Sequence, residues 1–195
     1  MKRLIATLSL LAMLTACQTS STKENPLLTE STLDYQAPDF SKIRPAHFVP
    51  AIEEGIRIQL AEIDSITSNT AAPTFENTVL AYEKSGRLLA RATSILSALV
   101  GADGTEELQK IDEETTPMLS AHHDALLLNE KLFARIKAVY DQRSSLQGED
   151  LRLTEVLYDQ FVHEGALLSA ADKEALKKIN SEIAVLQTKF TNQVN

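Results

Sequence analysis

Apolar residues recur at steps of three and four along most of this chain, which is the spacing of one side of an α-helix. In residues 50–66 the residues at such steps are Ile52, Ile56, Leu60 and Ile63. In the last such segment, which begins at residue 169, they are Leu176, Ile179, Ile183, Leu186, Phe190 and Val194. No alternating pattern of any length indicates a β-strand. The sequence therefore predicts an all-α fold of amphipathic helices.

Capping and breaking residues divide the pattern into six predicted helices. We expect them at about residues 50–66, 74–100, 105–127, 129–140, 149–164 and 169–194. Thr74 and Asn129 are suitable N-caps, Ser169 begins a near capping box, and Gly165 suits a left-handed helix end. Gly86 is predicted inside the second helix, where it would allow a close helix contact at a cost of ~1 kcal/mol. Pro117 is the predicted kink point of the third.

The first residues have the organisation of a secretory signal. Lys2 and Arg3 precede an uncharged, mostly apolar run over residues 4–16, and the sequence Leu-Thr-Ala-Cys follows at 14–17. This tetrapeptide resembles a lipobox, the cleavage signal of bacterial lipoproteins. We predict a signal peptide at 1–16 and lipid attachment at Cys17. The alternative is ordinary secretory cleavage beside an incidental thiol, but the only cysteine of the chain falls at this position.

These features place the protein in the cell envelope. Acyl chains on Cys17 would hold it to a membrane, and Gln18 favours the outer membrane, facing the periplasm. Residues 17–38 are rich in Ser, Thr, Asn and Pro, so we expect a lipidated N-terminus and flexible tether there. The helical domain is then expected at 39–195. With 27 acidic against 19 basic residues, the chain is not expected to bind nucleic acid, and we expect a monomer.

One dipeptide resembles the beginning of a zinc peptidase motif. His163 and Glu164 would open HExxH, but the second histidine position is occupied by Leu167. None of the histidines has another histidine four residues further on, the helical spacing that a shared zinc ion requires: His47, His122, His123 and His163. The acidic residues within 103–114 are expected to form a solvated helix face. We therefore predict no catalytic residue and no metal ligand in this chain.

Four segments, taken in order, resemble a known family. They are IRPAHFVPAIEEGI (43–56), PTFENTVLAYEKSGRLLAR (73–91), PMLSAHHDALLLNEKLFARI (117–136) and FVHEGALLSAADKEALKKINSEIAVLQTKF (161–190). Over about residues 39–194 the chain resembles the N-terminal region of the thimet oligopeptidase family of zinc metallopeptidases, above all its bacterial peptidyl-dipeptidase branch. In that family the segment matching His163 and Glu164 is a helix boundary.

The resemblance implies a function that this chain alone would lack. Full-length members are all-helical enzymes that cut short peptides, in which zinc activates a water and the glutamate of HExxH is the general base. Their N-terminal helices wall off one side of a deep channel, and HExxH lies several hundred residues further along. We therefore expect an inactive N-terminal fragment of an envelope-anchored peptidase, with zinc bound only by the full-length protein. The alternative is a non-catalytic, lipid-anchored helical module that binds peptides or another protein.

Overall fold

The computed structural model describes residues 25–194, and all the regular structure in this range is helical. The predicted all-α fold is confirmed for it. The longer helices are α1 (Phe48–Thr67), α3 (Arg87–Asp103), α4 (Glu106–Leu127), α5 (Glu130–Asp141), α6 (Gly148–His163) and α7 (Ala170–Val194). The shorter elements are η1 (Asp34–Gln36), η2 (Pro45–His47), the π turn η3 (Phe75–Val79), α2 (Leu80–Glu83) and η4 (Arg143–Ser145).

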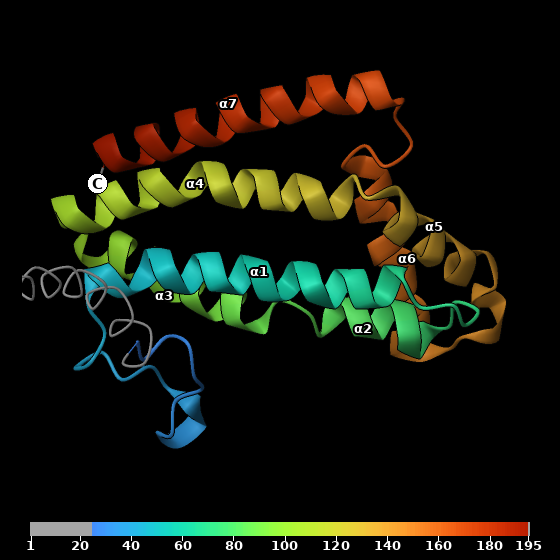
Figure 1. Cartoon of the computed structure of the whole chain (residues 1–195), viewed down its shortest axis with the longest axis horizontal. Coiled ribbons are helices and arrows are strands. Elements are labelled where there is room, and N and C mark those ends of the chain that lie inside the picture. The colour runs from blue at the N-terminus through green and yellow to red at the C-terminus, as the bar shows by residue number, and fades with distance from the viewer. Residues whose placement is uncertain (1–24, 195) are drawn as a thin grey trace, which may run out of the picture.

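Helices α1, α3, α4 and α7 lie side by side, and α5 and α6 close one end of the bundle (Figure 1). Helix α1 packs on both α3 and α4, whereas α7 lies along the opposite side of α4. Helices α5 and α6 pack against each other and against η3 at the end where α1 finishes. Helix α7 is therefore the outermost helix on its side of the bundle.

Two hydrophobic clusters stabilise this arrangement. The first joins η3, α5 and α6 around Phe161, which stacks on Phe133 at a ring distance of 6.1 Å and meets Tyr82 edge-on at 5.6 Å. The second lies at the other end, where Phe48 and Ile52 of α1 pack with Leu96 of α3. Large side chains of this kind each contribute about 1.5–3 kcal/mol when they are removed from water.

Several predicted helix boundaries are confirmed by their caps. The Thr74 hydroxyl accepts the Asn77 N–H at 3.2 Å, and Asn129 Oδ1 accepts the Leu132 N–H at 3.0 Å. The Ser169 hydroxyl accepts the Asp172 N–H at 3.2 Å just before α7. Gly165 follows α6 with a φ of 99°, which a glycine adopts without the penalty that a Cβ would impose.

The prediction of one continuous helix from 74 to 100 is wrong. Gly86 has a φ of 70°, so the chain leaves the helical path there and α3 begins at the next residue. The Gly86 N–H has no acceptor within a helix and donates instead to Glu62 Oε2 on α1 at 2.8 Å. The close contact expected of this glycine is present, because a Cβ at Gly86 would lie 2.4 Å from the Gln59 amide.

The predicted inner face of the first helix needs one correction. Ile52 and Ile63 are buried, but Leu60 is exposed. At 100° per residue Leu60 lies at the margin of the buried side, whereas Gln59 lies close to its centre. The polar Gln59 therefore occupies a core-facing position of α1, which the apolar spacing alone predicts for Leu60.

The boundary predicted at residue 39 also moves. The predicted tether includes residues 25–38, yet Leu27 is only 1% exposed and belongs to the second hydrophobic cluster. Asn25 Nδ2 donates to the His47 carbonyl at 2.8 Å, and Arg91 Nη2 donates to the Leu27 carbonyl at 2.9 Å. The packed region therefore begins no later than Asn25, while Cys17 and the signal segment lie outside the described residues.

Candidate functional site

The histidines were the first candidates for chemistry, and the structure gives each a separate environment. His47 Nδ1 accepts the Arg44 N–H at 3.1 Å at the start of α1. His123 Nε2 lies 3.6 Å from Glu164 Oε2, and His163 is the exposed last residue of α6. Within residues 25–194 no three His, Cys, Asp or Glu side chains gather to hold a metal ion. The described residues do not fit a zinc site of the peptidase kind.

His122 is the one histidine that lies inside the bundle. Its Nε2 is 2.7 Å from Gln59 Oε1, and Gln59 Nε2 donates to the Ser85 hydroxyl at 3.2 Å. The Ser85 hydroxyl in turn donates to the Tyr82 carbonyl at 2.7 Å. Together with the bond from Gly86 to Glu62, these contacts join α4, α1 and the α2–α3 junction through polar groups.

This network favours a neutral imidazole at His122. Burial lowers the pKa of His122, and the neighbouring His123 lowers it further. Nδ1 is buried without a hydrogen-bond partner among the described residues, as expected for the unprotonated nitrogen of an imidazole that donates through Nε2. The arrangement positions helices against one another. Sequence reasoning missed Gln59 because a polar residue at a core position has no spacing signal of its own.

The acidic stretch 103–114 begins at Asp103, the last residue of α3, and continues along the exposed side of α4. Asp103, Glu106, Glu107, Glu113 and Glu114 are all exposed. Asp112 is partly buried, which raises the pKa of its carboxyl, and the nearby Glu113 raises it further. These side chains form a solvated helix face.

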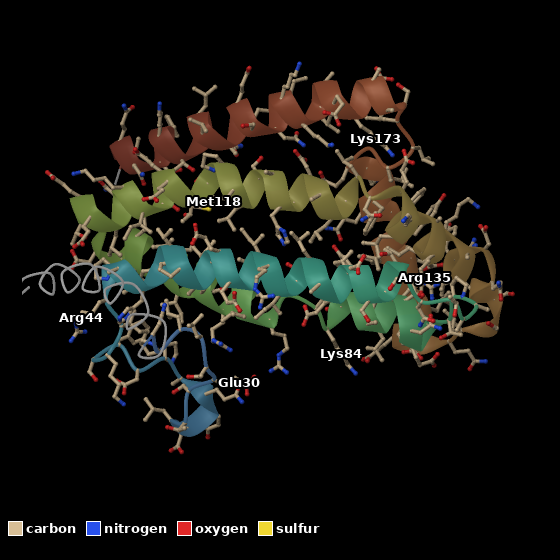
Figure 2. All side chains as sticks on the ribbon, in the orientation of Figure 1. Glu30, Arg44, Lys84, Met118, Arg135 and Lys173 are labelled. Carbon is tan, nitrogen blue, oxygen red and sulfur yellow. The ribbon has the colours of Figure 1, made fainter. Side chains whose placement is uncertain are left out.

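Hydrogen bonds between polar side chains join helix α7 to α4. Asn180 Nδ2 donates to Asp124 Oδ1 at 2.7 Å, and the Thr188 and Thr116 hydroxyls lie 2.9 Å apart. Near the start of α7 the buried Lys173, labelled in Figure 2, donates to Glu130 Oε1 at 3.3 Å. A groove of about 190 Å³ between α4 and α7 is lined mostly by small and polar residues that include Ser120 and Ser181.

The apolar side of α7 faces outward instead. Five of its large apolar side chains are exposed, from 45% for Ile183 to 68% for Phe190. We call these five the outer apolar row: Ile179, Ile183, Leu186, Phe190 and Val194. The sequence predicted an apolar face on this helix, but within the described residues none of the row belongs to either hydrophobic cluster. The row is the most extended apolar feature exposed on a single helix of the described region.

Membrane attachment is predicted for the N-terminus of the chain. None of the helices within residues 25–194 combines the length and the apolar character needed to cross a bilayer. A family model for a prokaryotic membrane lipoprotein lipid attachment site matches residues 1–18. The predicted lipoprotein signal is thereby confirmed, while lipid attachment at Cys17 itself stays a prediction.

Known proteins resemble most of this chain. A dipeptidyl carboxypeptidase of Salmonella typhimurium is 45% identical over 172 residues, which make up 87% of this chain and 25% of that protein. A dipeptidyl carboxypeptidase of Escherichia coli is 43% identical over 175 residues, 89% of this chain and 26% of the relative. An oligopeptidase A of Salmonella typhimurium is 24% identical over 172 residues. The chain spans about a quarter of the length of these curated relatives.

Proposed function

The chain is related over most of its length to the dipeptidyl carboxypeptidases and oligopeptidases A, and on this premise we propose that it forms the N-terminal helical region of a cell-envelope peptidase. The observation that carries the proposal is the 45% identity over 172 residues, which runs through both hydrophobic clusters. The substrates would be short peptides. The reaction would be cleavage of a peptide bond, with dipeptides as the expected product of the branch that the chain most resembles.

The role of this region is structural. Its helices would form one side of the channel that admits short peptides and excludes folded proteins. The polar network around His122 and Gln59 fixes α4 against α1, and the bond from Gly86 to Glu62 fixes the start of α3, so the wall keeps its shape. The zinc ion and the general base would be supplied by polypeptide outside residues 25–194.

The attachment to the membrane belongs to the same proposal. Cleavage before Cys17 and acylation of its sulfur would anchor the protein, and Gln18 favours the outer membrane with the peptidase in the periplasm. The match of residues 1–18 to a lipoprotein attachment site supports the lipid attachment. Labelling cells with a radioactive fatty acid tests it, because a Cys17→Ser variant should lose the label while an unaltered chain keeps it.

The coding sequence after Asn195 provides the test of the enzymatic assignment. We expect an HExxH motif in one of the reading frames within the next several hundred codons, followed by a peptidase activity that chelators abolish. A stop codon with no such motif in any frame, together with a monomeric and cooperatively melting product, would instead favour a lipid-anchored module that binds peptides or another envelope protein. Peptide hydrolysis by residues 17–195 alone would contradict both assignments.

A further inference from the structure

The outer apolar row has the geometry of a helix-packing surface. Its members follow at steps of four, three, four and four residues, so they form one stripe along α7. At 1.5 Å per residue the stripe extends over about 22 Å. A single exposed leucine is ordinary on a protein surface, but a contiguous apolar stripe of this length marks a contact site.

The orientation of the stripe is fixed by the polar side of the same helix. The bonds from Asn180 to Asp124 and from Thr188 to Thr116 lie two turns apart on α7, and both join it to α4. Rotating α7 to bury the stripe against α4 would break both bonds and leave Asp124, which is buried, without this partner. The helix is therefore held with its apolar side presented outward, and this pre-organises it for a partner.

We propose that the outer apolar row is the docking surface for an apolar helical segment within the remaining three quarters of the peptidase polypeptide. The inference rests on the proposed function. The relatives are about four times as long as the matched stretch, so a peptidase of their length would hold such a partner in the same polypeptide. Helix α7 already has α4 on its other side, which leaves the row as its free face.

A second copy of the chain is the less suitable occupant. Stable dimers bury roughly 800 Å² on each partner, and five side chains that are each only 45–68% exposed supply less than that by themselves. An intramolecular contact does not have to offset the loss of translational freedom, so a narrow stripe is sufficient for it. A covalently continuous partner therefore suits the row better than a separate molecule.

The test compares the same substitutions in two contexts. In the first, the 195-residue chain is studied alone in detergent. In the second, its residues 25–194 replace the matched stretch of the Salmonella typhimurium dipeptidyl carboxypeptidase. The variant in the row is Leu186→Asp with Phe190→Asp, and the matched control is Lys178→Asp with Lys189→Asp, two exposed residues on the charged side of α7.

We expect the row variant to leave the melting temperature of the isolated chain unchanged or higher, because both side chains are exposed there. In the chimera it should raise the unfolding equilibrium constant at least about tenfold, because a carboxylate would replace a buried apolar group. The control pair should change the stability of the isolated chain and of the chimera by the same amount. Deuterium exchange should also show α7 protected in the chimera and not in the isolated chain. If the aspartates prevent the chimera from folding, Leu186→Ser with Phe190→Ser should give the same contrast in weaker form.

Two results would overturn the inference. One is a chimera in which α7 exchanges as fast as in the isolated chain, or in which the row and control variants melt alike. The other is an isolated chain that sediments as a dimer and becomes monomeric in the row variant, while α7 stays unprotected in the chimera. Peptide hydrolysis by the chimera is measured separately. If the chimera does not hydrolyse peptides although α7 is protected, the proposed function is contradicted and the inferred docking surface is not.

Discussion

The imidazole of His122 on α4 and the side-chain amide of Gln59 on α1 meet at 2.7 Å inside the helical bundle. Because Gln59 also donates to Ser85, this pair connects two long helices to the residue that precedes the left-handed Gly86. The contact couples the mutual position of α1 and α4 to the break between α2 and α3. Because Nδ1 is buried without a partner among the described residues, the neutral imidazole is favoured in this contact.

The stability of the protein should therefore fall in mild acid. Burial and the neighbouring His123 place the pKa of folded His122 below its ordinary value of 6.5. As the pH falls below about 6.5, the unfolded chain takes up a proton that the folded chain does not, so the free energy of unfolding decreases. Urea unfolding of a His122→Gln variant should give a free energy of unfolding that is about 1–3 kcal/mol lower at neutral pH. Between pH 8 and 5 this free energy should fall less steeply with decreasing pH than it does in the parent protein. His163→Gln, which alters an exposed side chain, should keep the slope of the parent; equal slopes in all three proteins would contradict the prediction.

The close approach of α1 to α3 depends on Gly55. A Cβ at this position would lie 2.8 Å from the Leu89 Cα and 2.9 Å from its backbone nitrogen, and a backbone cannot move aside as a side-chain end can. We expect Gly55→Ala to destabilise the fold by about 1–3 kcal/mol, despite the better helix propensity of alanine. Gly101→Ala on α3 is the control, because a Cβ there meets no atom within 4 Å. Chemical denaturation should find the control unchanged or stabilised by up to about 1 kcal/mol; a stabilised Gly55→Ala would rule out the tight contact.

The N-terminal segment should contribute to stability even though its composition resembles a tether. Leu27→Ala removes a side chain from the second hydrophobic cluster, so the expected loss is about 2–5 kcal/mol. Leu33→Ala removes the same atoms from an exposed position in the same segment and should change stability by less than about 0.5 kcal/mol. Thermal unfolding of the two variants side by side provides the measurement. If both substitutions change stability by similarly small amounts, residues 25–38 behave as a flexible tether and the prediction is contradicted.

The parts of the fold that were predictable are those that local chemistry decides. Thr74 and Asn129 begin helices because their side chains satisfy free backbone N–H groups nearby in the sequence. The break at Gly86 is not apparent from the spacing, and the Gly86 N–H finds its acceptor on Glu62, which is 24 residues away. The burial of Leu27 likewise depends on α1 and α3, and residues 25–38 show no spacing that announces it. Tertiary contacts decided both outcomes.

The candidate site follows the same division. The absence of an HExxH spacing around His163 is visible in the letters, and so is the apolar spacing of α7. The direction in which that apolar side faces is not visible in the sequence, because the polar partners of Asn180 and Thr188 lie on α4, more than fifty residues earlier. Spacing identifies the row of Ile179 to Val194 as one face of a helix. Only the packing of α7 against α4 shows that this face is exposed.

Zinc uptake by residues 17–195 tests the central claim most directly. After dialysis against a zinc buffer, elemental analysis should find far less than one zinc ion per chain, with no hydrolysis of a quenched peptide, because the histidines of the described region lie in separate environments. One tightly held ion per chain, lost in a His122→Ala or a His163→Ala variant, would contradict the account and place a metal centre within this region.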